Sequence, residues 1–265
     1  MKVAVWGAGN IGTGLVRRLA ICPFVSEIIW TNRKFENIDR ARIDIVHGLA
    51  FSPSCRAIQA VHQQRAHHRV KDADLLVLTL GKRVPPGASR TLIYQANAPL
   101  FHQTVVPAIR AGFSGVVLVI TNPVDLMVRL LHREGGLGWR RVIGLGTVVE
   151  TARLRSSIGD HLSPERPARD VWAYAVGTHD SSFVPVLVPH PAVGTALSDD
   201  RRRRIVRLAK QEAVKGAERV KDETGSSLHP IVEGAVSVAK AIATDSHEVL
   251  TVSCLDPATA DSDRL

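Results

Sequence analysis

The chain has 265 residues, of which 45% are hydrophobic and 22% are charged. This composition is typical of a globular chain with a substantial core and excludes disordered, collagenous and coiled-coil classes. The apolar runs are much shorter than the about 20 residues that a membrane helix needs. The formal net charge of +9 favours anionic partners, which include phosphorylated cofactors, carboxylate substrates and nucleic acid, without choosing among them.

Cysteine usage and the N-terminus indicate a cytoplasmic protein. Cys22, Cys55 and Cys254 are far apart, so we predict neither a disulfide framework nor a cysteine metal site. The chain begins with one Lys and a short apolar run that enters a glycine turn, and a secretory signal would need a longer apolar stretch.

The first half of the chain alternates short β-branched runs with longer helical patterns. The predicted strands are 2–6, 27–31, 74–80, 116–120 and 142–145, and the predicted helices are 11–21, 36–49, 91–111 and 124–133. Continuously apolar strands separated by helices are typical of a parallel sheet covered on both faces. We therefore predict an α/β, doubly wound (Rossmann) dinucleotide-binding domain over residues 1–148.

The pattern changes near residue 150. Helices are predicted at 150–162, from Asp199 to about 221 and at 230–243, and strands at 171–176 and 249–253. We expect a second, α+β substrate domain over residues 149–265.

A glycine triplet directly follows the first strand and opens the first helix. Gly7, Gly9 and Gly12 enclose Ala8, Asn10 and Ile11 in a G-x-G-x-x-G motif. The first glycine makes a tight turn, the second lets backbone approach a pyrophosphate, and the third lets helix and strand pack closely. The setting predicts dinucleotide binding.

The residues after the second strand bear on the choice of cofactor. An NAD-binding domain usually places a carboxylate there to bind the ribose 2′-hydroxyl. This chain has Asn32, followed by Arg33 and Lys34, and two cations suit a 2′-phosphate. We therefore predict NADP in preference to NAD, with NAD left possible if the two cations are merely solvated.

Four further segments carry polar residues in positions suited to chemistry. They are the Pro/Gly loop 79–90, Thr-Asn-Pro-Val-Asp at 121–125, Glu-Thr-Ala-Arg at 150–153 and Gly-Thr-His-Asp at 177–180, which precedes Val-Pro-Val. With the glycine turn, they resemble the lactate/malate dehydrogenase family in the family's own order, through nearly the whole chain. The resemblance implies reversible hydride transfer between a nicotinamide cofactor and a small 2-hydroxy or 2-oxo acid.

The resemblance also assigns roles by position. His179 would be the acid–base group, with Glu150 holding its ring where the family has Asp. Arg153 would bind the substrate carboxylate, and Arg90, on a closing loop, would polarise the substrate carbonyl. Asn122 would contact the substrate oxygen or the nicotinamide. Gly81, in the loop that carries Arg90, would bind cofactor.

Three positions bear on substrate choice. Val84 lies six residues before Arg90, where the family's substrate-facing residue would be Arg in a malate enzyme. An apolar 2-oxo acid is therefore favoured over a dicarboxylate, although the adjacent Arg83 could turn inward. Ser227, in a motif of the C-terminal half, is small and leaves room for a larger side chain.

Two departures from the family leave a second hypothesis open. Asp180 stands where the family has Gly after the catalytic His, and the family continues with strands and a long helix beyond the point where this chain stops. Apolar surface is then expected unless a partner subunit covers it. A catalytically impaired nucleotide-binding paralogue, acting as a sensor or assembly partner, is the alternative.

The remaining expectations concern partners. The basic run 201–204 precedes apolar residues at helical spacing and is expected to be a solvated helix face, so we predict no nucleic-acid partner. No metal and no membrane association are predicted. The resemblance implies a homo-oligomer, a dimer or a tetramer.

Overall fold

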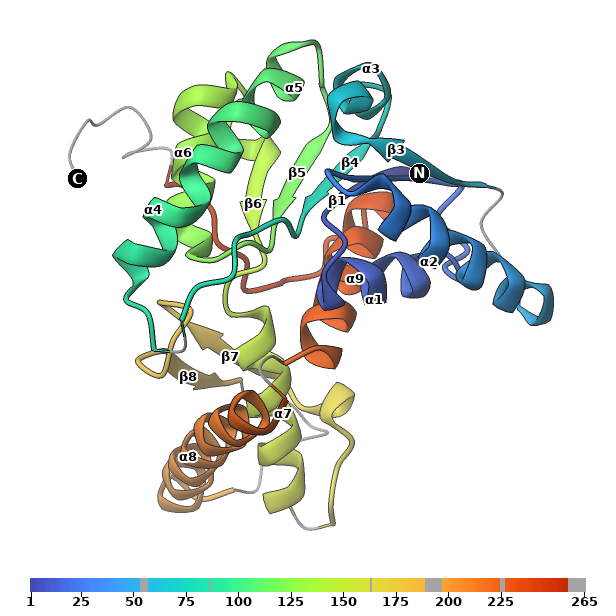
Figure 1. Cartoon of the computed structure of the whole chain (residues 1–265). Helices are drawn as coiled ribbons and strands as arrows, with labels where there is room; N and C mark the ends of the chain where they lie inside the picture. The colour runs from blue at the N-terminus through green and yellow to red at the C-terminus, as the bar shows by residue number, and fades with distance from the viewer. Residues whose placement is uncertain (53–56, 86, 163, 189–196, 225–226, 257–265) are drawn as a thin grey trace. The chain divides into compact units, whose positions relative to one another are not determined.

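Six short strands with buried side chains form one sheet in the computed structural model, which describes residues 1–52, 57–85, 87–162, 164–188, 197–224 and 227–256 (Figure 1). All the strand pairings are parallel, and the strand order is β3-β2-β1-β4-β5-β6. The strands are β1 (Lys2–Trp6), β2 (Glu27–Asn32), β3 (Ala57–His62), β4 (Leu75–Leu78), β5 (Val116–Val119) and β6 (Val142–Gly144). The order reverses between β1 and β4, and ligands bind at the carboxyl ends of strands at such a point.

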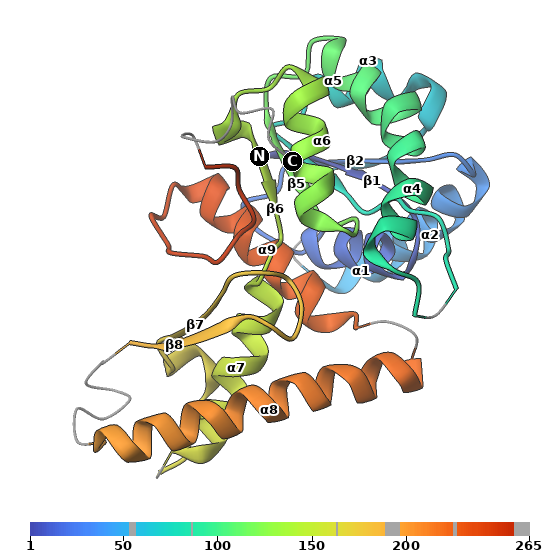
Figure 2. The same ribbon diagram turned by 90° about the vertical axis from the view of Figure 1, so that its left-hand side faces the viewer.

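Helices lie on both faces of this sheet, as the two views show (Figures 1 and 2). One face carries α1 (Asn10–Leu19) and α2 (Phe35–Gly48); the other carries α3 (Ala66–Val70), α4 (Arg90–Leu100), α5 (Val106–Arg110) and α6 (Val124–Gly135). The predicted doubly wound parallel sheet is therefore confirmed.

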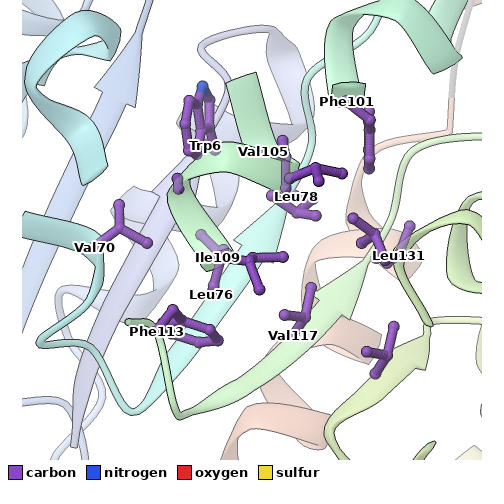
Figure 3. Packing of buried hydrophobic residues seen from close by; sticks show 14 of the residues in the cluster. Trp6, Val70, Leu76, Leu78, Phe101, Val105, Ile109, Phe113, Val117 and Leu131 are labelled. Atoms are coloured by element: carbon purple, nitrogen blue, oxygen red, sulfur yellow. The ribbon is translucent and has the colours of Figure 1, made fainter. Parts of the chain in front are cut away.

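The larger described hydrophobic core lies between the sheet and the second helical layer (Figure 3). Trp6, Leu76 and Val117 come from three strands, and Phe101 and Ile109 come from the helices that cover them. Each of these side chains is at most 2% exposed. Their burial fixes the helices on the sheet, because apolar area removed from water stabilises by about 25 cal/mol per Å².

The chain divides into two compact units. The first contains Met1–Leu145, Ala235–Glu248 and the segment that begins at Ser253; the second contains Gly146–Gly234 and Val249–Val252. The second unit holds α7 (Val148–His161), the antiparallel pair β7 (Ala173–Val176) and β8 (Val184–Leu187), and α8 (Asp199–Thr224), while α9 (His229–Thr244) crosses the division. Its own core contains Leu154, Phe183 and Ile205. The predicted α+β character is confirmed.

Short helical turns complete the described elements. They are η1 (Leu49–Phe51), η2 (Gln63–Arg65), η3 (Phe101–Val105), η4 (Trp139–Arg141) and η5 (Ala168–Asp170).

One predicted helix is broken. The pattern at 91–111 predicts a continuous helix, but a π-helical turn, η3, separates α4 from α5. Pro107 lies at the start of α5 and has no N–H to donate to the carbonyl of Gln103. The α-helical ladder therefore cannot continue there, and a wider turn carries the chain across.

Strand predictions also differ from the structure at three places. β3 was not predicted, because its Gln and Ala residues are weak strand formers, and its pairing with β2 stabilises it. β8 was also missed. The expected strand 249–253 is not formed: Ser253 makes a single antiparallel bridge, with Gly144, through hydrogen bonds of 2.7 and 2.9 Å.

None of the helices in the described ranges is long and apolar enough to cross a membrane. The same part of the chain contains no group of three or more His, Cys, Asp or Glu side chains that could hold a metal ion.

Candidate active site

The glycine turn has the geometry that a dinucleotide requires. Gly7 has a φ of +130°, and the indole N–H of Trp30 donates to its carbonyl at 2.8 Å. A Cβ on Gly12 would overlap the backbone oxygen of Gly7, so only glycine permits this packing. A Cβ on Gly9 would meet no protein atom within 4 Å, and Gly9 directly precedes the first turn of α1. The site is thus open where a pyrophosphate would approach the helix N-terminus.

The residues that would meet the adenosine ribose follow β2. Asn32 is the last residue of the strand, and its side-chain amide donates to the carbonyl of Lys34 at 3.4 Å. Arg33 and Lys34 are exposed, directly before α2. This position holds an amide and two cations in place of a carboxylate.

A buried side chain that sequence reasoning missed joins two loops at the carboxyl edge of the sheet. Asn97 is 3% exposed. Its amide oxygen accepts from the backbone N–H of Lys82 at 2.8 Å, and its nitrogen donates to the carbonyl of Asn122 at 2.9 Å. Asn97 therefore holds the Gly81 and Asn122 segments in one arrangement.

The cation predicted to act on a carbonyl is tethered within the first unit. Arg90 is the first residue of α4, whose N-cap, Ser89, accepts from Leu92 N at 3.2 Å. The Arg90 guanidinium donates to Asp125 at 3.1 Å, and the hydroxyl of Ser253 donates to the other Asp125 oxygen at 2.7 Å.

The loop that carries Arg90 exposes one of the two positions that were predicted to bear on substrate choice. Arg83 is exposed and Val84 is half-buried. Pro86, Gly225 and Ser226 of the matching motifs lie outside the described residues, as does Cys55.

Three side chains that are far apart in sequence meet in the second unit. One oxygen of Glu150 lies 2.8 Å from Nδ1 of His179, and the other lies 3.3 Å from the Arg153 guanidinium. The Glu150 side chain is only 8% exposed. A carboxylate held between an imidazole and a guanidinium orients both, and it leaves Nε2 of the imidazole available for proton transfer.

The arginine of this trio is partly desolvated. Burial lowers the pKa of Arg153, and the nearby Glu150 carboxylate opposes that effect. A guanidinium that has lost part of its hydration binds a further carboxylate more strongly, because less water must be removed.

The Asp180 side chain is hydrogen-bonded within its own turn. Its carboxylate accepts from the backbone N–H of Ser182 at 2.8 Å and from the hydroxyl of Ser182 at 2.5 Å. These bonds hold the acid in the loop that follows His179.

A cavity of about 450 Å³ lies beside Arg153 within the second unit. Arg153 and Ser227 both line it. Part of its wall is apolar, from Ala213, Ala217 and Leu228, whereas Asp160 and Glu212 contribute carboxylates. The predicted substrate residues Arg153 and Ser227 are therefore brought to one space.

Glu212 also joins α8 to α7. It accepts hydrogen bonds from the hydroxyl of Ser157 and from His161, the latter at 2.9 Å. The Ser157 bond is the main cause that lowers the pKa of Glu212 below its ordinary value of 4.5, and His161 adds to the shift.

Replacing Glu212 with Gln is expected to lower Tm by about 1–3 °C at pH 7, since half-exposed ion pairs contribute about 1 kcal/mol at most. A carboxyl whose pKa is lowered by folding stabilises above its ordinary value and loses that contribution as pH falls through the lowered one. The difference in Tm between wild type and variant should therefore shrink below pH 4.5. Thermal unfolding at several pH values measures it, with the exposed Glu218→Gln as control. A difference that does not vary with pH would contradict the assignment.

Other site residues were also missed from the sequence. Asp125 lies within a recognised motif, but its pairing with Arg90 spans 35 residues. Thr151 lies within the Glu-Thr-Ala-Arg motif but was given no role, and Thr147 and Arg155 lie outside the recognised motifs. These three residues are spaced four apart along a largely buried helix. Because buried polar side chains need hydrogen-bond partners, this spacing could have indicated their role.

Known proteins resemble this chain in sequence. Residues 1–144 match the profile of the lactate/malate dehydrogenase NAD binding domain. An L-lactate dehydrogenase of Priestia megaterium is 30% identical over 262 residues, which cover 96% of this chain and 80% of that relative.

Two solved structures have the same fold. A lactate dehydrogenase from a Medee basin deep-sea metagenome library has a TM-score of 0.83 at 27% identity, and 98% of this chain and 83% of that chain are covered. The minor L-lactate dehydrogenase of Enterococcus mundtii has a TM-score of 0.85 at 25% identity, with 97% and 82% covered. Since the profile spans more than half of the sequence and the Priestia relative is matched over four fifths of its length, the chain belongs to the lactate/malate dehydrogenase family.

Proposed function

We propose that the protein is a nicotinamide-dependent 2-hydroxy acid dehydrogenase. The observation that carries this proposal is the Glu150 carboxylate, which lies 2.8 Å from His179 and 3.3 Å from Arg153. An acid–base group and a carboxylate-binding group that share one buried partner suit a substrate whose hydroxyl and carboxylate are on adjacent carbons. The bound nicotinamide supplies the acceptor or donor of hydride.

His179 handles the proton. With Nδ1–H donating to Glu150, Nε2 carries the lone pair and takes the proton of the substrate hydroxyl as the carbon is oxidised. In the reverse direction, the imidazolium returns the proton to the carbonyl oxygen. Glu150 stabilises the imidazolium and keeps the ring in one tautomer, so its role is to position His179.

Arg153 and Arg90 handle charge on the substrate. The planar fork of Arg153 binds the carboxylate through two parallel hydrogen bonds. Arg90 polarises the carbonyl oxygen once it leaves Asp125, a half-exposed pair that contributes about 1 kcal/mol at most and so releases readily. Asn122, held through Asn97, serves the substrate oxygen or the nicotinamide.

The preferred substrate is an apolar 2-oxo acid larger than pyruvate. Val84 offers no charge for a second carboxylate, and Ser227 is small. The 450 Å³ cavity beside Arg153 has an apolar wall that includes Ala213, Ala217 and Leu228. An apolar side chain gains about 0.8 kcal/mol for each buried CH₂ group.

The preferred cofactor is NADP. The Gly7–Gly12 turn fits the pyrophosphate of either nicotinamide dinucleotide, but Asn32 lacks the carboxylate that binds the ribose diol of NAD. Arg33 and Lys34, both exposed beside it, suit a 2′-phosphate. A homo-oligomeric state and a cytoplasmic location stay predictions.

Initial rates test both preferences together. Pyruvate, oxaloacetate and branched 2-oxo acids are each assayed with NADH and with NADPH. We expect the largest kcat/KM with a branched 2-oxo acid and NADPH. A preference for oxaloacetate would contradict the substrate assignment, and a higher kcat/KM with NADH would contradict the cofactor assignment.

The alternative, a catalytically impaired paralogue, rests on the Glu150 and Asp180 departures. It predicts that NADH or NADPH binds tightly but that no 2-oxo acid in the panel is reduced. That outcome would exclude a dehydrogenase.

A further inference from the structure

The edge of β7 that faces away from β8 is partnered by a helix. Ala175 lies opposite Pro185, which has no N–H, and the register places the backbone groups of Ala175 on the side away from β8. A backbone N–H and C=O at such an edge need partners when they are buried, and Ala175 is fully buried.

Side chains of α7 and of its N-cap residue, Thr147, supply those partners. Thr147 donates to the carbonyl of Ala175 at 2.6 Å, and Thr151 accepts from its N–H at 2.9 Å. Arg155 donates to the carbonyl of Ala173 at 2.8 Å. The hydroxyl of Thr151 also pairs with that of Thr251 at 2.8 Å.

The spacing explains why a helix can replace a strand here. Thr147, Thr151 and Arg155 are four residues apart, which is about 6 Å along an α-helix. Two residues of a strand, such as Ala173 to Ala175, span about 6.7 Å. These three side chains, the threonine–arginine stripe, therefore follow the strand closely enough to bond its edge. They set the register of β7 along α7.

The register of β7 along α7 affects the acid–base pair, because Glu150 lies on α7 and His179 follows β7. Glu150 precedes Thr151 on α7, and His179 follows Ala175 by four residues, after Gly177 turns the chain at a φ of +112°. We propose that Thr147, Thr151 and Arg155 are positioning residues that hold His179 against Glu150. This inference rests on the proposed function for its kinetic consequence only; the 2.8 Å contact can be measured without turnover.

The decisive experiment measures that contact directly. In a ¹H–¹⁵N spectrum of the imidazole groups, the Nδ1 proton of His179 is identified as the signal lost in His179→Asn. Wild type should show it far downfield and slow to exchange, because it is bonded to a buried carboxylate. Thr151→Val, which removes the hydroxyl at nearly constant shape, should broaden or abolish the signal. Thr151→Ser, which keeps the hydroxyl, should retain it.

Kinetics supplies the second measurement. A displacement of the order of 1 Å can lower a rate by about 10²-fold, so Thr151→Val should lower kcat by about 10- to 100-fold. KM for the 2-oxo acid and the Kd of NADPH should change by about twofold or less, and Thr151→Ser should retain most of the wild-type kcat. Thr104→Val is the matched control, since the Thr104 hydroxyl donates to the carbonyl of Leu100, four residues earlier in the chain, at 2.6 Å.

The outcomes separate this inference from the proposed function. An unchanged His179 signal in folded Thr151→Val would overturn the inference even if the wild type is an active dehydrogenase. A signal lost in Thr151→Val and kept in Thr151→Ser would support it even if no 2-oxo acid is reduced. Equal losses in Thr151→Val and Thr151→Ser would also count against it, because the hydroxyl would then not be the cause.

Discussion

Replacing His179 with Asn should lower kcat for reduction of a 2-oxo acid by about 10²- to 10⁴-fold, the usual contribution of a positioned acid–base group. Asn keeps a polar side chain near Glu150 but cannot shuttle a proton at the assay pH. The affinity for NADPH should not change, because the glycine turn lies in the other compact unit. Steady-state rates and equilibrium binding of NADPH measure the two effects separately.

His161→Asn is the matched control for this experiment. His161 is also a histidine paired with a glutamate in the second unit, since its Nε2 lies 2.9 Å from Glu212. It should retain kcat within about twofold, since His161 pairs with Glu212, which takes no part in the proposed proton transfer. A His179→Asn enzyme with more than about one tenth of the wild-type kcat would exclude His179 as the acid–base group.

Replacing Arg153 with Lys should raise KM for the 2-oxo acid by about 10- to 100-fold, because a hydrogen bond to a charged group contributes about 1.5–3 kcal/mol. Lysine keeps the charge but loses the planar fork that binds both carboxylate oxygens, and it would also disturb the contact with Glu150. Some loss of kcat should accompany the rise in KM for that second reason. Initial rates over a range of 2-oxo acid concentrations measure both parameters.

Arg207→Lys, an exposed position on α8, is the control for Arg153→Lys. It should leave KM within about twofold of wild type, as is usual for surface substitutions. If Arg153→Lys also left KM unchanged, the substrate carboxylate would have to bind elsewhere. The dehydrogenase proposal would then lose its substrate-binding residue.

The replacement of the family's aspartate by Glu150 shows what a sequence comparison leaves open. Glu is one methylene longer than Asp, so its reach to His179 could not be judged from the motif alone. In the folded chain one carboxylate reaches both His179 and Arg153, at 2.8 and 3.3 Å.

Secondary-structure predictions failed once for a local reason and otherwise where distant parts of the chain decided the outcome. The helix predicted over 91–111 missed its break, although Pro107 signalled it locally. The strand predicted over 249–253 is not formed, because strand propensity does not supply a pairing partner. Within that segment only Ser253 forms a β-bridge, with Gly144. β3 was missed for the opposite reason, since its pairing with β2 outweighs weak propensity.

The amino-acid sequence by itself determined the doubly wound sheet and the glycine turn, because apolar periodicity and the steric freedom of glycine act between near neighbours along the chain. It also led to His179 and Arg153 as proposed site residues, through motifs that resemble those of the family. Only the tertiary structure decided that Glu150 links them, that Asn97 joins two loops and that a threonine–arginine stripe sets the register of β7. These contacts join residues as many as 29 positions apart, and hydrogen bonds of 2.6–2.9 Å depend on strand register and helix placement that no local pattern contains.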